Sequence, residues 1–138
     1  MENKLNVFKM TFYLIYKHQI RKSEDAVSAS GWAIGVIVLA LDLYLFSTLS
    51  MLEHFNFPGI VYINDVFFDG ESGKLFLLVG NFILFLYFYF SYSANGKLEE
   101  LCKTAESESV GMKKIKRVSL TFLILSPLCL LISGSFYL

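Results

Sequence analysis

The sequence predicts an all-α membrane protein with three transmembrane helices and an N-terminal amphipathic helix. Of the 138 residues, 55% are apolar and only 17% are charged, and the mean hydropathy is +0.55. Three apolar runs approach or exceed the roughly 20 residues that a helix needs to cross the hydrocarbon layer. A soluble chain of this length could not bury helices that are apolar on every face. We therefore expect residues 1–138 to form a single polytopic membrane domain.

The first predicted element is an amphipathic helix at about residues 3–22. At about 100° per residue, its aromatic and aliphatic side chains fall on one side, and Lys4, His18 and Lys22 cluster on the other. The charged residues that follow argue against a cleaved signal peptide. Two placements stay open: the helix lies in the membrane interface, or it packs on the protein's own helices in the cytoplasm.

The three predicted spans cover about residues 31–52, 74–93 and 118–138. Of the 12 lysines and arginines, five precede the first span and six lie between the second and third. Short loops rich in Lys and Arg stay in the cytoplasm. We therefore expect the N-terminus and the 94–117 loop to be cytoplasmic, and the 53–73 loop and the C-terminus to be outside. The composition is compatible with a bacterial source, which predicts a multi-pass protein of the inner (plasma) membrane.

The outer loop contains the triplets "VYI" and "VFF" around Asn64 and Asp65. Two β-rich triplets joined by Asn-Asp predict a small hairpin. A lone hairpin is marginally stable in water, so this one would rest on the bundle as a lid or serve as a surface for a partner.

The inner loop is expected to begin with a short helix, because apolar residues recur at helical spacing over residues 98–105. A basic cluster follows at the membrane edge, formed by Lys113, Lys114, Lys116 and Arg117. Such clusters anchor the topology and contact anionic lipid. A regulatory ligand that carries phosphates, or a regulatory protein, is the alternative partner for these side chains.

A single carboxylate, Asp42, interrupts the first span. On a helical projection it lies on the same stripe as Gly31 and Gly35, a G-x-x-x-G pair of the kind that lets membrane helices pack closely. A carboxylate facing lipid near a helix centre would cost at least about 2.5 to 3.5 kcal/mol. We therefore expect Asp42 to face either another helix of its own chain or the axis of an oligomer.

The other two spans carry weaker polar groups. Asn81 lies halfway along the second span, where an amide is expected to hydrogen-bond to another helix. In the third span, Ser119, Ser126 and Ser133 are seven residues apart and form one stripe of hydroxyl groups. The stripe is expected either to pack against a helix or to line a pore.

Pro127 follows the middle serine and lacks the N–H group that would bond the carbonyl of Leu123. In lipid such a carbonyl needs another partner. Because of this requirement, we expect the helix surface around Pro127 to face protein or a cavity.

Motifs for catalysis or cofactor binding are not apparent. The segment "GESGK" lacks the spacing and the hydroxyl residue of a phosphate-binding loop. Glu53 and His54 are adjacent, but the second histidine, His18, is expected on the other side of the membrane, so no metal site is predicted. Net charge is zero, which gives no reason to expect binding to nucleic acid. We expect neither an enzyme nor a bound cofactor.

Two functional hypotheses remain. In the first, the chain forms a homo-oligomeric channel or membrane-permeabilising effector, with a ring of Asp42 carboxylates in the pore and regulation from the cytoplasmic side. The alternative is a non-conducting membrane binding protein, such as a toxin-immunity protein or an accessory subunit, in which Asp42 makes a structural contact.

Overall fold

The computed structural model describes residues 6–22, 24–67, 70–107 and 110–136, and within them the regular structure is helical. The predicted all-α class is therefore confirmed. A five-residue π-helical segment, η1, continues the fourth helix. The elements in chain order are α1 (Val7–Arg21), α2 (Ala26–His54), α3 (Ile60–Phe67), α4 (Gly70–Phe88), η1 (Tyr89–Ser93), α5 (Lys97–Glu106) and α6 (Val110–Ser135).

Three helices are long and apolar enough to cross a membrane: α2 with 29 residues, α4 with η1 over 24, and α6 over 24. Less than a third of the most apolar stretch of each helix is buried inside the protein. The remaining surface of these stretches is largely aliphatic and aromatic, and such a surface is stable against lipid rather than water. These features indicate a multi-pass membrane protein.

The first span begins earlier than the sequence predicted, at Ala26 rather than residue 31. The cause is an N-terminal cap: Asp25 Oδ1 accepts a hydrogen bond from the backbone N–H of Ser28 at 2.8 Å. The same hydrogen bond is the main cause that lowers the pKa of Asp25. The cap satisfies an amide that would otherwise have no partner in the first turn. For this reason the helix begins at Ala26, directly after Asp25.

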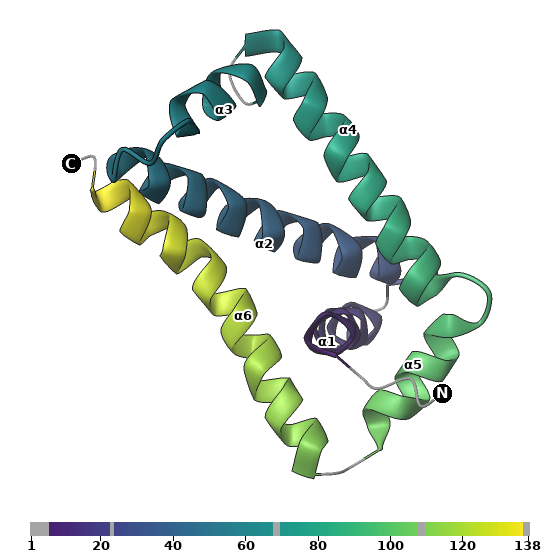
Figure 1. Ribbon diagram of the computed structural model, residues 1–138. Coiled ribbons are helices and arrows are strands. Elements are labelled where there is room, and N and C mark those ends of the chain that lie inside the picture. Colours follow the sequence, from purple (N-terminus) through teal and green to yellow (C-terminus); the bar gives the residue numbers. More distant parts are fainter. Residues whose placement is uncertain (1–5, 23, 68–69, 108–109, 137–138) are drawn as a thin grey trace.

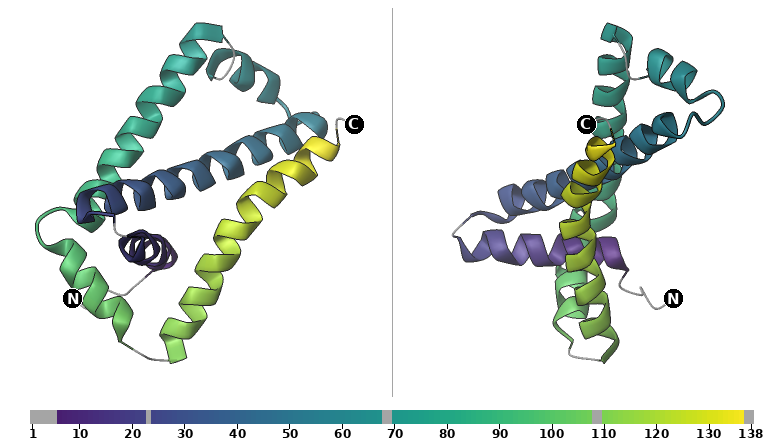
Figure 2. Two further views of the ribbon diagram at one scale, coloured as in Figure 1. Left: turned by 180° about the vertical axis from the view of Figure 1, so that it is seen from behind. Right: turned by 90° about the vertical axis from the view of Figure 1, so that its left-hand side faces the viewer.

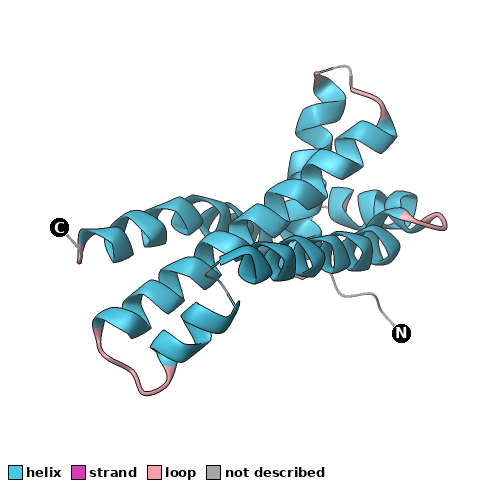
Figure 3. Cartoon of the chain, turned by 90° about the horizontal axis from the view of Figure 1, so that it is seen from above, coloured by secondary structure: helices cyan, strands magenta, loops and turns pink. Residues whose placement is uncertain are grey.

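The three long helices do not form a parallel bundle. Figure 1 shows α2 crossing the middle of the molecule with α4 and α6 on either side, and α6 converging with α2 near the C-terminal end of the chain. Viewed from the side, α1 runs across the direction of α4 and α6 (Figure 2). Viewed from above, the helices are joined by short loops (Figure 3). The N-terminal end of α6 lies beside α5, at the opposite end of the molecule from α3 (Figure 1).

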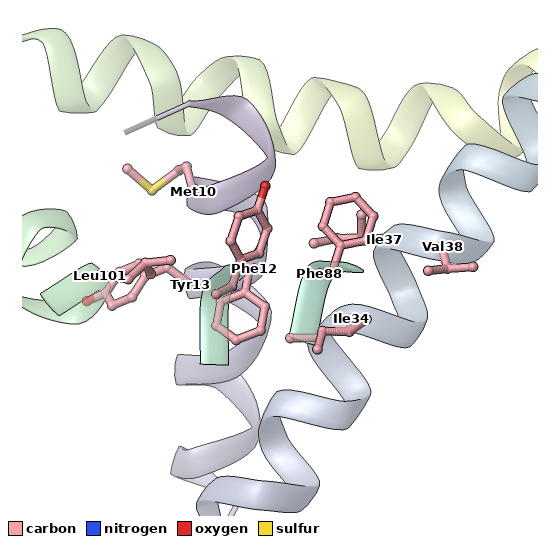
Figure 4. Packing of buried hydrophobic residues seen from close by; sticks show 10 residues of the cluster. Met10, Phe12, Tyr13, Ile34, Ile37, Val38, Phe88 and Leu101 are labelled. Carbon is pink, nitrogen blue, oxygen red and sulfur yellow. The ribbon is translucent and has the colours of Figure 1, made fainter. Parts of the chain in front are cut away.

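The crossing helix α1 supplies much of the hydrophobic core. Phe12 is fully buried, and its ring lies 5.7 Å from Tyr92 of η1 and 6.0 Å from Tyr16, measured between centroids. Phe8 makes an edge contact with Phe122 of α6 at 5.6 Å. Figure 4 shows the buried side chains of α1 facing those of α2, with Phe88 between them. The core therefore consists of contacts between α1 and the three spans.

The predicted hairpin in the outer loop is wrong, because the segment folds as helix α3. Asn64, expected in a turn, lies inside that helix, and its side-chain amide donates to Glu53 Oε2 at the end of α2, 3.0 Å away. The chain reverses before α3, at Asn56 and Gly59, which have positive φ angles of 53° and 81°. The helical conformation also buries Ile60, whereas a hairpin with three-residue strands would bury little.

The helix predicted at the start of the inner loop is confirmed as α5. Leu101 is buried, and Leu98, Cys102 and Ala105 pack against the same core. The amphipathic spacing in the sequence was therefore sufficient to place this helix.

Truncating Phe12 tests the importance of the core around α1. We expect Phe12→Ala to lower the free energy of unfolding in detergent micelles by about 3 to 5 kcal/mol, because the fully buried ring leaves a cavity. Phe82→Ala is the control, since Phe82 lies on the outer surface of α4 and is 60% exposed. Equal losses for the two variants would show that α1 does not anchor the core.

Candidate functional site within the membrane-spanning helices

The carboxylate in the first span contacts another helix of its own chain. Asn81 Nδ2 on α4 donates a hydrogen bond to Asp42 Oδ2 on α2, at a distance of 2.8 Å. Both residues are half-buried and lie near the middle of their helices. Of the two environments that the sequence left open for Asp42, the structure shows the contact within the chain.

The stripe of serines on α6 is buried. Ser119, Ser126 and Ser133 all lie at 3% exposure or less, and the main helix contacts of α6 are with α1 and α2. Ser119 Oγ donates to the backbone carbonyl of Val7 in the first turn of α1, 3.0 Å away. Ser133 Oγ donates to the carbonyl of Leu130 on its own helix at 2.9 Å. In the single chain the stripe packs between helices, as one of the two sequence interpretations expected.

Ser126 supplies the hydrogen bond that Pro127 removes. The carbonyl of Leu123, four residues before the proline, cannot accept its usual backbone N–H. Ser126 Oγ donates to this carbonyl at 2.9 Å. One residue before Leu123, the carbonyl of Phe122 accepts a hydrogen bond of 2.6 Å from the Tyr44 hydroxyl of α2. The backbone around the proline is thus bonded by side chains instead of water, which fits a helix in hydrocarbon.

Tyr44 was not identified from the sequence as a site residue. A tyrosine inside an apolar run is usual near the ends of spans, so its role near the proline could not be read from its position. The sequence offered one chemical hint of this contact. The first span has a tyrosine hydroxyl that can donate a hydrogen bond, and the third span has a proline that leaves a backbone carbonyl without its N–H donor.

The glycine pair on α2 makes no close contact with another helix among the described residues. A Cβ atom added to Gly31 or Gly35 would meet nothing within 4 Å. An open groove of about 560 Å³ lies there instead, lined by both glycines, Trp32, Leu39 and Phe85, among others. If the G-x-x-x-G pair serves helix packing, the second helix therefore belongs to another molecule.

The predicted basic cluster is divided by the structure. All four side chains are exposed. A cavity between α1, α5 and α6 is lined by Lys113 and Lys116 but not by Lys114 and Arg117. The cavity also contains basic residues of α1, which sequence reasoning did not connect with the cluster. Only the packing of α1 against α6 brings together these two segments, about 100 residues apart.

Metal-binding side chains do not cluster in the described residues. These residues contain no group of three His, Cys, Asp or Glu side chains that could hold a metal ion. Cys102 and Cys129 are free thiols. No protein-family model, curated protein or solved structure matches the chain.

The contact between Asp42 and Asn81 can be measured with a double-mutant cycle. Asn81→Leu is expected to lower the free energy of unfolding by about 1 to 3 kcal/mol, because it removes the donor to a half-buried carboxylate. Combining it with Asp42→Leu should recover part of this loss. We expect a coupling energy of about 0.6 to 1.7 kcal/mol from unfolding in mixed micelles. Strictly additive effects would contradict a direct contact.

Two serines that share the same local geometry allow a matched test of the proline compensation. Ser126→Ala should destabilise α6 by about 1 to 3 kcal/mol, since it leaves a carbonyl without a partner. Ser133→Ala should cost less, because the carbonyl of Leu130 keeps its helical N–H donor. In a Pro127→Ala background, Ser126→Ala and Ser133→Ala should lower the thermal unfolding temperature by equal amounts. A difference that persists in this background would exclude the proposed role of Ser126.

Proposed function

We propose that this chain is a non-conducting multi-pass membrane protein that acts by binding a partner, as an accessory subunit or the immunity protein of a membrane-active toxin does. The observation that supports it is the hydrogen bond between Asp42 and Asn81. The carboxylate that a pore would need is engaged within one chain, near the middle of the spans. The serine stripe is likewise buried between the helices of that chain. The polar groups of the spans thus serve the fold.

The outer loop offers a surface for such a partner. Phe55, Phe57, Val61 and Tyr62 are exposed around α3, and Tyr62 is 71% exposed. Asn64 fixes α3 to the end of α2 through Glu53, so these aromatic side chains are presented by an ordered segment. Large exposed apolar patches mark interaction sites or membrane contacts. A membrane-embedded partner would meet this surface at the bilayer edge.

A homo-oligomeric channel is the second candidate, and the open groove at Gly31 and Gly35 favours it. This groove leaves a small-residue face of α2 accessible to a neighbouring copy. In a channel, Asp42 would have to break its hydrogen bond with Asn81 and turn toward the pore. Regulation would act at the cytoplasmic loop.

We further propose that the protein lies in a bacterial plasma membrane with its N-terminus and α5 in the cytoplasm. The distribution of basic residues supports this orientation. The arrangement of helices agrees with it, because α5 and the basic end of α6 lie at one end of the molecule and α3 at the other (Figure 1).

Ion flux separates the two functions. Protein reconstituted in liposomes that hold a potassium gradient should not speed the loss of the gradient, because Asp42 and Asn81 bond each other and the serine stripe is buried within the chain. Detergent-purified protein should behave as a monomer by light scattering. Potassium efflux that Asp42→Asn alters, from a protein shown to be oligomeric, would instead establish the channel. Gly35→Leu serves as a control, since it should leave a monomer unchanged and disrupt an oligomer.

Cysteine labelling tests the orientation. In a Cys102→Ser/Cys129→Ser background, Glu99→Cys on α5 and Glu71→Cys at the start of α4 place one exposed thiol near each end of the molecule. A membrane-impermeant maleimide added to intact cells should label position 71 and spare position 99. The reverse pattern would indicate the opposite topology. Labelling of both positions in sealed cells would contradict insertion of the chain across the membrane.

A further inference from the structure

The cavity between α1, α5 and α6 combines a basic rim with an apolar interior. It has a volume of about 630 Å³. Figure 1 shows α1 lying between α5 and the N-terminal half of α6, and residues of all three helices line the cavity, which is partly open. Its lining includes four lysine and arginine side chains: Lys17, Arg21, Lys113 and Lys116. Among the described residues that line it, Glu106 is the only carboxylate.

The charge changes systematically along the wall formed by α6. Lys113, Lys116, Leu120 and Leu123 all line the cavity, and their spacing of three, four and three residues places them on one face of the helix. Over these ten residues, or roughly 15 Å, that face passes from two ammonium groups to two aliphatic side chains. The two leucines lie within the third span predicted from the sequence at about residues 118–138, and the two lysines precede it.

The wall formed by α1 has the same polarity. Met10 and Leu14 line its apolar part, and Lys17, His18 and Arg21 line its basic part. Lys17 Nζ donates to the Tyr13 hydroxyl at 2.9 Å, and this hydrogen bond is the main cause that raises the pKa of Lys17. The ammonium group is therefore held in place and remains protonated. Two helices thus present matching apolar and cationic halves to one space.

We infer that this cavity binds a single anionic membrane lipid, with the phosphate of its headgroup among the lysines and arginine and the first part of its acyl chain against the leucines and Met10. A soluble phosphate would use the basic rim but gain nothing from the apolar half. A neutral lipid would leave the four basic side chains with Glu106 as the only carboxylate among the described lining residues. The inference depends on insertion of the three spans and not on whether the chain conducts ions or binds a protein partner.

The basic cluster on α6 provides a matched test. Lys113→Gln/Lys116→Gln removes two charges that line the cavity, and Lys114→Gln/Arg117→Gln removes two charges that do not, from the same stretch of helix. All four side chains are exposed, so both variants should keep the thermal stability of the parent protein. They carry the same net charge and therefore differ only in where the charge is lost.

The full-length protein, purified in a mild detergent, is titrated with phosphatidylglycerol or phosphatidylcholine, and bound lipid is counted by native mass spectrometry. We expect one tightly retained phosphatidylglycerol per chain. Lys113→Gln/Lys116→Gln should weaken its binding roughly tenfold or more, while Lys114→Gln/Arg117→Gln should change it less than about twofold. Arg21→Gln on α1 should also weaken it, because Arg21 lines the same cavity.

Three results would overturn the inference. Equal weakening by the two double variants would indicate diffuse attraction to the basic surface instead of a cavity. Equal retention of phosphatidylcholine would show that the headgroup charge is not recognised. Displacement of the lipid by inorganic phosphate at comparable concentration would assign the basic rim to a soluble phosphate compound.

Discussion

The absence of water from the hydrocarbon layer is the constraint on which this structure depends. Polar groups inside the spans need partners within the protein, and three side-chain hydrogen bonds in α2, α4 and α6 provide such partners. Asn81 donates to Asp42 between α2 and α4. Tyr44 of α2 and Ser126 of α6 donate to the consecutive carbonyls of Phe122 and Leu123, in the turn of α6 that precedes Pro127. The two bonds that join different helices fix the rotation of those helices relative to each other, since turning either helix would separate donor from acceptor.

The crossing helix α1 determines how the spans are spaced. Its aromatic residues fill the space between α2, η1 and α6, so the three long helices diverge instead of forming a tight bundle. Ser119 joins α6 to the first turn of α1 through the carbonyl of Val7. One consequence is that the basic C-terminal part of α1 lies beside the basic start of α6. The cavity for a lipid headgroup follows from this packing and has no counterpart in either segment alone.

The surfaces that remain unoccupied point to a protein that works through contacts. The aromatic surface around α3, the open groove beside Gly31 and Gly35, and the basic cavity are at different places on the molecule. In the proposed orientation they would accommodate a partner outside, a neighbouring helix in the bilayer and a lipid at the inner edge. In contrast, the polar groups of the spans are engaged in the fold, which leaves little polar surface to line a conduit.

The sequence by itself determined the all-α class, the three spans and the helix α5. Hydrophobic length and periodicity are local properties, and the bilayer imposes them on each segment separately. The prediction from sequence was wrong in the outer loop, where two β-rich triplets indicated a hairpin. The segment is a helix instead, because the contact of Asn64 with Glu53 and the burial of Ile60 favour that conformation. Tertiary structure alone decided that Asp42 meets Asn81, and that α1 shares a cavity with α6. These pairings join residues far apart in the chain, and their energy depends on the relative rotation and crossing of helices, which no local pattern encodes.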